Sequence, residues 1–288
     1  MTYQQDNDKL YRYLFQNRAV RGEWVRLNQT FTDTLNTHYY PKAVQNLLGE
    51  MMVATNLLTA TLKFNGNITV QIQGDGPLKL ALVNGSDNQE IRALARVDGD
   101  INDGMSLHEM IGKGVLVITI APTEGERYQG VIALDKPTIT ECLEEYFVRS
   151  EQLQTQLIIR TGEFDGKPVA AGMLLQIMPD GQGTPEDFEH LATLTATVKD
   201  EEIFGLTAEE MLYRLYHEET VEIYPPQAVK FHCGCSAERS GAALMLISDE
   251  EIDEILAEHK GSIDMQCECC GTHYFFNKDA INKLKAQA

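Results

Sequence analysis

The sequence predicts an α+β protein in three parts. We expect an N-terminal domain of antiparallel sheets with a buried helix (residues 1–178), a helical linker (179–230) and a small C-terminal zinc-binding domain (231–288). Three observations predict this order: short apolar segments separated by turns, a strongly acidic middle segment, and cysteines gathered near the C-terminus. A chain of 288 residues is also long enough for about two domains with cores of their own.

The first elements come from hydrophobic periodicity. Residues 8–17 fit either a short helix or a strand, and residues 19–27 alternate as a strand does, with Trp24 expected in the core. A long helix is predicted from about residue 42 to residue 62. Its apolar positions cover a wide face, which indicates a central helix buried on most sides.

Strands and turns then follow at regular spacing, which favours antiparallel sheets. Gly74-Asp75-Gly76-Pro77 and Asn84-Gly85-Ser86 are typical turn sequences. A helix is predicted over about 138–155, with Cys142 packed in the core. The predicted strands cover residues 68–73, 78–83, 91–97, 115–120, 131–134, 157–160 and 169–177.

The segment 179–230 carries 3 basic and 12 acidic residues, a net charge of −9. It nevertheless contains helix start signals: Thr184 before Pro185, and the capping box that begins at Thr207. Apolar residues recur at helical spacing in two stripes, 188–198 and 211–216. Two interpretations stay open, an ordinary helical subdomain and a linker whose helices are only marginally stable because dense like charge opposes compaction.

Residues 231–288 are too few to form a stable hydrophobic core without an additional cross-link. We expect a helix from Ser248 to about residue 259, a strand over 274–276 and a final helix from about Lys278. The cross-link is predicted to be one Zn²⁺ ion, because zinc favours a closed tetrahedral site of four thiolates. A Cys-x-Cys pair and, 31 residues later, a Cys-x-x-Cys pair supply them: Cys233, Cys235, Cys267 and Cys270.

Three neighbouring side chains leave alternatives open. Cys269 is the odd thiol, expected as a small packing residue, although it can replace a ligand or exchange into a disulfide. His232 and His273 lie beside the cysteines and are alternative ligands, but four thiolates fit the spacing better.

Charge and motifs exclude several function classes. With 24 basic and 43 acidic residues the net charge is −19, which disfavours nucleic acid and anionic membranes. No secretory signal and no membrane-spanning run is found, so a reducing cytoplasm is expected. A site closed by four thiolates leaves no open position for catalysis, and the paired glycines at 74–76 and 112–114 lack the spacing of a phosphate loop. We therefore expect a protein that is not an enzyme, with a zinc-ribbon module for a protein or nucleic-acid partner as the alternative.

Several blocks of the chain resemble the heat-shock protein 33 family of redox-regulated holdase chaperones. The resemblance rests on the cysteine pattern, flanked by Ile263-Asp264-Met265 and Gly271-Thr272-His273-Tyr274, and on blocks in the first domain. Those blocks are residues 21–27 (RGEWVRL), 57–63 (LLTATLK), 73–78 (QGDGPL) and 125–130 (GERYQG). One departure is Cys269, a third cysteine inside the Cys-x-x-Cys pair.

The resemblance implies a mechanism. Reduced protein would hold zinc on the four cysteines and be inactive, and oxidants would form the disulfides Cys233–Cys235 and Cys267–Cys270 and release the zinc. The C-terminal domain would then unfold, the linker would loosen, and apolar surface would bind unfolding client proteins. The resemblance further implies a homodimer as the active form and ATP-dependent refolding chaperones as downstream partners.

Overall fold

Residues 6–61, 65–178 and 184–287 are described by the structure, a computed structural model. The chain forms two compact units, Met1–Phe231 and His232–Ala288. Both contain helices and strands, which confirms the predicted α+β class. The described part of the acidic segment folds within the first unit. A border between residues 178 and 179 therefore stays a prediction. None of the helices in the described ranges is long and apolar enough to cross a bilayer.

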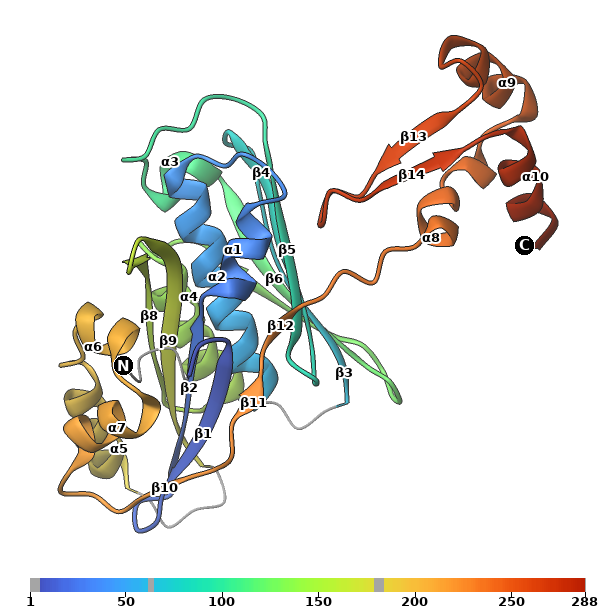
Figure 1. Cartoon of the computed structure of the whole chain (residues 1–288). Coiled ribbons are helices and arrows are strands. Elements are labelled where there is room, and N and C mark those ends of the chain that lie inside the picture. The colour runs from blue at the N-terminus through green and yellow to red at the C-terminus, as the bar shows by residue number, and fades with distance from the viewer. Residues whose placement is uncertain (1–5, 62–64, 179–183, 288) are drawn as a thin grey trace. The chain divides into compact units, whose positions relative to one another are not determined.

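The first unit is built on two sheets with helix α2 (Lys42–Thr61) between them (Figure 1). Sheet A has the order β10-β1-β2-β9-β8, with β11 also paired to β1. Its strands are β1 (Lys9–Phe15), β2 (Val20–Leu27), β8 (Thr155–Phe164), β9 (Lys167–Ile177), β10 (Val221–Ile223) and β11 (Gln227–Ala228). All its pairings are antiparallel, as predicted. Residues 8–17, left open between helix and strand, supply β1.

Sheet B has the order β12-β5-β4-β3-β6-β7. Its strands are β3 (Gly66–Gly74), β4 (Leu78–Ser86), β5 (Glu90–Val97), β6 (Gly114–Pro122), β7 (Tyr128–Ala133) and β12 (Lys230–Phe231). Only the β12–β5 pairing is parallel among the described strands. The seven strands predicted between residues 68 and 177 are all present, with ends that differ by a few residues.

Helix α2 is buried on most sides, as predicted, because it packs against both sheets. Fifteen of its 20 residues are buried. Gly172 on β9 allows the close approach, since a Cβ atom there would lie 2.5 Å from Val53 of α2. Around the helix lie α1 (Gln29–Leu35), α3 (Leu107–Ile111) and α4 (Ile139–Tyr146). Of these, α1 and α3 were not predicted.

The predicted helix over 138–155 was wrong at its C-terminal end. Helix α4 stops at Tyr146 and a π-helical turn follows, Phe147–Glu151. Gln152 then takes left-handed backbone with φ of 56°, which ends the helix. Thr155 already belongs to β8, where it pairs with Gln176. Cys142 is 1% exposed on α4, so its predicted core position is confirmed.

The opposite face of sheet A is covered by the acidic segment. Three helices lie on it: α5 (Pro185–Thr195), α6 (Asp200–Gly205) and α7 (Ala208–Tyr216). The predicted caps at Thr184 and Thr207 are formed. The apolar stripes face the sheet, where Leu191 and Met211 join a buried cluster with Trp24 and Met173. Helix α6 was not predicted, and its C-terminal carbonyls at Phe204 and Leu206 accept hydrogen bonds from buried Arg26 (2.9 and 2.8 Å).

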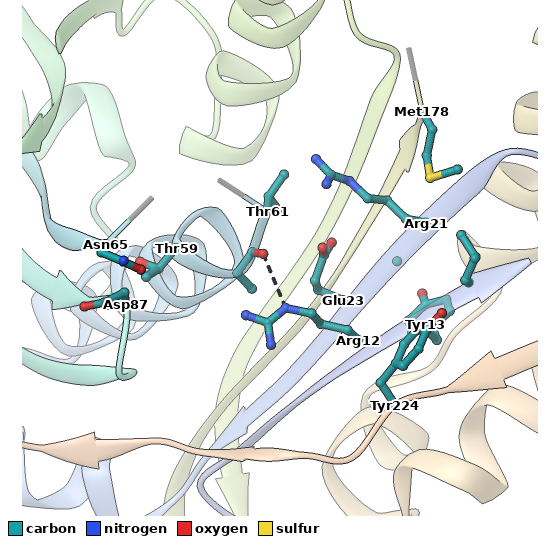
Figure 2. A pocket seen from close by; sticks show the side chains of 13 residues that line it. Arg12, Tyr13, Arg21, Glu23, Thr59, Thr61, Asn65, Asp87, Met178 and Tyr224 are labelled. Atoms are coloured by element: carbon teal, nitrogen blue, oxygen red, sulfur yellow. Dashed lines mark hydrogen bonds between the residues drawn. The ribbon is translucent and has the colours of Figure 1, made fainter. Parts of the chain in front are cut away.

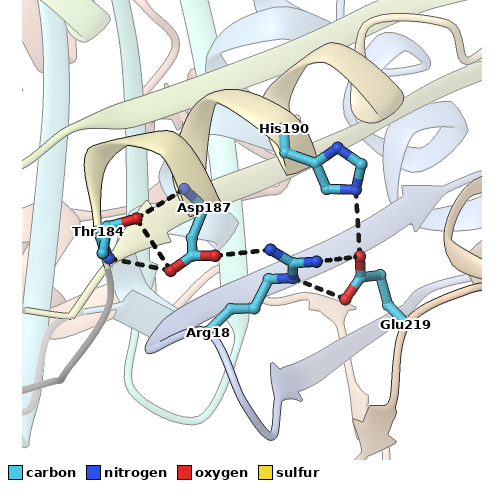
Figure 3. Close-up of polar contacts among 5 residues, drawn as sticks. All are labelled: Arg18, Thr184, Asp187, His190 and Glu219. Carbon is cyan, nitrogen blue, oxygen red and sulfur yellow. Dashed lines mark hydrogen bonds and ion pairs between the residues drawn. The ribbon is translucent and has the colours of Figure 1, made fainter.

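Arg18, in the turn between β1 and β2, ties both ends of the helical segment to sheet A (Figure 3). Its guanidinium donates to Asp187 at the start of α5 (2.6 Å) and, through two nitrogens, to Glu219 after α7 (2.7 and 2.8 Å). His190 also contacts Glu219, at 3.1 Å. Hydrogen bonds from Arg18 hold the pKa of Glu219 below its usual value. One cation therefore joins two points 32 residues apart in sequence.

The second unit is small. It contains α8 (Ala237–Gly241), a 3₁₀ turn (Leu244–Leu246), α9 (Asp249–Glu258), β13 (Ile263–Gln266), β14 (His273–Phe276) and α10 (Lys278–Gln287). The predicted elements over 249–259, 274–276 and from Lys278 are present. Its buried cluster consists of six apolar residues: Leu244, Ile252, Leu256, Ile263, Phe276 and Ile281. So small a core leaves little hydrophobic stabilisation to offset chain entropy.

We predict that Arg18→Gln loosens the helical segment without unfolding sheet A, because it removes the charge-assisted bonds to Asp187 and Glu219. Hydrogen exchange followed by mass spectrometry should show roughly several-fold faster exchange in residues 185–195 and 217–223. Exchange in β2 and β9 should be unchanged. Arg214→Gln, whose ion pair with Glu202 is more exposed, is the matched control and should have little effect. Equal exchange in the two variants would contradict this role.

Candidate metal centre

Two short loops of the second unit bring four cysteines together. Cys233 and Cys235 lie between β12 and α8, and Cys267 and Cys270 lie in the turn between β13 and β14. Their four sulfur atoms all lie within 4.8 Å of one another. Two contacts join the loops: Cys233 to Cys267 at 3.6 Å and Cys235 to Cys270 at 3.4 Å. All six cysteines lie in the described part of the chain, and none of them forms a disulfide.

The β13–β14 turn is shaped by backbone hydrogen bonds across the cysteine pair. The amide of Cys267 donates to the carbonyl of Thr272 (2.9 Å), and the amide of Gly271 donates to the carbonyl of Cys267 (2.8 Å). Gly271 has φ of 70°, a conformation that glycine adopts without a steric penalty. This turn presents the sulfurs of Cys267 and Cys270 on one side.

The Cys-x-Cys loop is held from the adjoining helix α8. Ser236 caps this helix by accepting from the amide of Arg239 (3.2 Å), and the Arg239 guanidinium donates to the carbonyl of Gly234 (2.7 Å). Gly234 thus lies in a loop fixed by a side chain five residues later. This geometry places the sulfurs of Cys233 and Cys235 where they can bind the same metal ion.

Two hydroxyl groups contact the sulfurs, and sequence reasoning missed both of them. Tyr274 lies 3.0 Å from the sulfur of Cys235, and Thr272 lies 3.2 Å from that of Cys270. Burial raises the pKa of the Cys270 thiol, but hydrogen bonds with Thr272 and contacts with Cys235 and Cys267 outweigh it and lower the pKa to about 7. Polar groups that contact ligand atoms in this way orient and tune metal sites. In the sequence, only the position of Thr272 and Tyr274 within two to four residues of the last cysteine pointed to these contacts.

The three neighbouring side chains are separate from this group. Cys269 is 8% exposed, and it lies outside the described four-sulfur cluster, as do His232 and His273. His273 contacts Asp264 at 2.9 Å through Nδ1. The site residues expected from the sequence are therefore brought together by the fold. That they ligate a metal stays a prediction.

The arrangement suits a soft, closed metal site. Four thiolates packed this closely would repel one another unless a cation lay among them, and thiolate ligands select soft or borderline transition-metal ions. The four sulfurs lie within binding distance of a common ion and therefore indicate a metal site. Four protein ligands would leave no coordination position of the metal open.

Comparison with known proteins finds similar chains over nearly the whole length. The profile of the family described as "Hsp33 protein" matches residues 8–277. A protein of Haemophilus influenzae (strain PittEE) named "33 kDa chaperonin" is 87% identical over 284 residues, covering 99% of this chain and 97% of the relative. A protein of the same name from Actinobacillus succinogenes is 85% identical over 287 residues and the full length of both chains.

A solved structure supports the fold independently. The crystal structure of a 33 kDa chaperonin (heat shock protein 33 homolog) from Thermotoga maritima superposes with a TM-score of 0.82. It covers 97% of this chain and 98% of that one, at 21% sequence identity.

We predict that serine at any one of Cys233, Cys235, Cys267 or Cys270 lowers the metal content of the reduced protein from about one ion per chain to a small fraction of that. Cys269→Ser and Cys142→Ser are the matched controls and should keep the full content. Elemental analysis of protein purified under reducing conditions measures the metal content of each variant. Metal loss in Cys269→Ser would instead make that residue a ligand.

Proposed function

The chain belongs to the Hsp33 family, and we propose that it is a redox-regulated, ATP-independent holdase chaperone, inactive when reduced and active when oxidised. Relatives that cover almost the whole chain are named chaperonins, which supports a chaperone rather than an enzyme. The observation that carries the redox part is the group of four cysteine sulfurs, not joined by disulfides, that lie within 4.8 Å of one another in a unit with a very small core.

The ion would be Zn²⁺, held by Cys233, Cys235, Cys267 and Cys270. A tetrahedral zinc ion with Zn–S bonds of about 2.3 Å separates its sulfurs by about 3.8 Å. The observed separations of 3.6 Å between Cys233 and Cys267 and 3.4 Å between Cys235 and Cys270 are near that value. The bound ion would keep all four sulfurs as thiolates and stabilise the second unit, because a structural zinc site contributes its binding free energy to folding.

Oxidation would dismantle the site. With peroxide as oxidant, each pair of thiolates gives up two electrons, and the peroxide takes them with two protons to leave two water molecules. The proposed products are the disulfides Cys233–Cys235 and Cys267–Cys270. Disulfide sulfur is a poor ligand, so zinc would leave. With six buried apolar residues, the second unit would then lose its fold.

The acidic segment would be the next part to loosen. It carries a net charge of −9, so mutual repulsion opposes its compact form. Its helices stay on sheet A through the apolar cluster around Leu191 and Met211 and through Arg18 and Arg26. Only His232 lies between β12 and Cys233, so disorder spreading from the second unit would reach the end of the segment first.

Release of the segment would expose two apolar surfaces at once. One is the helical stripes, and the other is the outer face of sheet A, which includes Trp24, Met173 and Leu175. Both would bind apolar stretches of unfolding client proteins, while the acidic side chains would keep the complex soluble. We also propose a cytoplasmic location, a homodimer as the active form, and ATP-dependent refolding chaperones that receive the clients.

The direct test measures light scattering of a heat-unfolded client protein in the presence of this chain. Reduced, zinc-loaded protein should leave aggregation unchanged. Protein treated with peroxide at mildly raised temperature should suppress it at near-stoichiometric ratios, with release of about one zinc per chain to a colorimetric chelator. Suppression that does not depend on oxidation, or oxidation that leaves zinc and four thiols in place, would contradict the proposal.

We further predict that Leu191→Asp and Leu194→Asp raise client holding by the reduced protein. Leu191 is fully buried against sheet A and Leu194 is partly buried there, so a carboxylate at either position favours release of α5. Leu191→Asp should have the larger effect. Thr193→Asp adds the same charge on the exposed side of α5 and is the matched control. Reduced-state activity equal in all three variants would contradict the role of the segment as a cover.

A further inference from the structure

A polar cavity of about 640 Å³ opens at the end of α2 in the first unit (Figure 2). The sheet register builds it: Arg12 of β1 is directly opposite Glu23 of β2, and Arg21 follows two residues away on the same face. The last turn of α2, from Thr59 to Thr61, forms part of its wall. Figure 2 shows the carboxyl group of Glu23 between the guanidinium groups of Arg12 and Arg21.

The charged groups of this cavity have unused hydrogen-bonding capacity. Glu23 is 2% exposed, and its Oε2 has no hydrogen-bond partner among the described residues; the same holds for Nε of Arg21. Arg21 donates to Gln176 (2.6 Å), and Arg12 donates to the carbonyl of Ala60 and to Gln227 (both 3.3 Å). Within the described residues, neither arginine forms an ion pair with Glu23 at 4.0 Å or less. Buried polar atoms without a hydrogen-bond partner are rare in folded proteins.

A second cavity, of about 330 Å³, adjoins the first, because Arg21 and Thr61 line both. The rest of its lining comes from α2, β6, β7, β9, the end of α4 and the chain that follows α4. Most of these residues are apolar or aromatic, beside the polar residues Ser150, Glu151 and Gln176. The apolar and aromatic residues are Leu58, Ile118, Ile120, Tyr128, Tyr146, Phe147 and Leu153. A mainly apolar hollow beside a few placed polar groups is the usual form of a small-molecule site.

We propose that the two cavities together bind a small amphipathic carboxylate of the medium-chain fatty acid class. Its carboxylate lies beside the carboxyl group of Glu23, where it accepts hydrogen bonds from Arg12 and Arg21, and its hydrocarbon tail lies among the side chains of the second cavity. The guanidinium group matches a carboxylate in shape and charge, which a neutral headgroup does not. This inference is independent of the proposed chaperone function.

Glu23 is compatible with an anionic ligand. Burial raises the pKa of Glu23 to about 7, although Arg21 and Arg12 act in the opposite direction. Near neutral pH a large share of the molecules therefore carries a proton on Glu23. The protonated carboxyl group donates a hydrogen bond to a ligand oxygen instead of repelling it.

The ligand would also stabilise the first unit. Met178, at the end of β9, and Tyr224, after β10, line the polar cavity, so chain on both sides of residues 179–223 contributes to its wall. A molecule that binds only the folded form raises the free energy of unfolding in proportion to the logarithm of its concentration.

Isothermal titration calorimetry on the reduced, zinc-loaded full chain tests the proposal. Decanoate, kept below its micelle concentration, should bind saturably with one site per chain. Acetate, which lacks the tail, and decanol, which lacks the charge, should each bind at least about tenfold more weakly. Decanol binding as tightly as decanoate, or decanoate that does not saturate at one site, would overturn the proposal.

Variants locate the site. Arg12→Gln and Arg21→Gln should each weaken decanoate binding by about tenfold or more, whereas Arg96→Gln, a matched control on the exposed side of β5, should not. Circular dichroism checks that each variant is folded. Unchanged affinity in folded Arg12→Gln and Arg21→Gln would overturn the assignment. If either variant does not fold, the comparison of acetate, decanoate and decanol on the unmodified protein decides.

Discussion

Sheet A is apolar on both faces, and it stays out of water only because something covers each of them. Helix α2 covers one face, and α5, α6 and α7 cover the other. The second cover is made from the most acidic part of the chain, so its packing on Trp24 and Met173 has to exceed its own repulsion. This balance leaves the outer face of sheet A dependent on the acidic helices for its cover, whereas α2 packs on the other face.

The covering segment is fixed at few points, and they differ in chemistry. Arg26 satisfies the carbonyl groups at the end of α6 from inside the protein, whereas Arg18 holds α5 and Glu219 from a partly exposed turn. Dissolved salt screens the partly exposed ion pairs of Arg18, but it has little effect on the buried hydrogen bonds of Arg26. The second unit, by contrast, has a core of six buried apolar residues beside its cluster of sulfurs, so its hydrophobic core alone supplies little stability.

Periodicity predicted most of the first unit because its strands and α2 bury large, regular faces. It failed where structure depends on distant partners. Strands β11 and β12 are two residues long and exist through pairing with β1 and β5. The π-helical turn after α4 ends at Gln152, a left-handed residue that no apolar pattern marks. At the metal centre the spacing of the cysteines was sufficient, since ligand geometry restricts spacing. The hydroxyl of Tyr274 and the cavity at Arg12 and Glu23 arise from strand register, which a single sequence does not reveal.

The burial of Cys142 has a chemical consequence for the first unit. This thiol is 1% exposed on α4 and burial raises its pKa, so little of the nucleophilic thiolate forms and oxidants have little access to it. The thioethers of Met51, Met52 and Met173 are likewise shielded from solvent. These buried sulfur atoms are therefore protected from oxidants, whereas the four clustered cysteines of the second unit are only partly buried and more accessible to them.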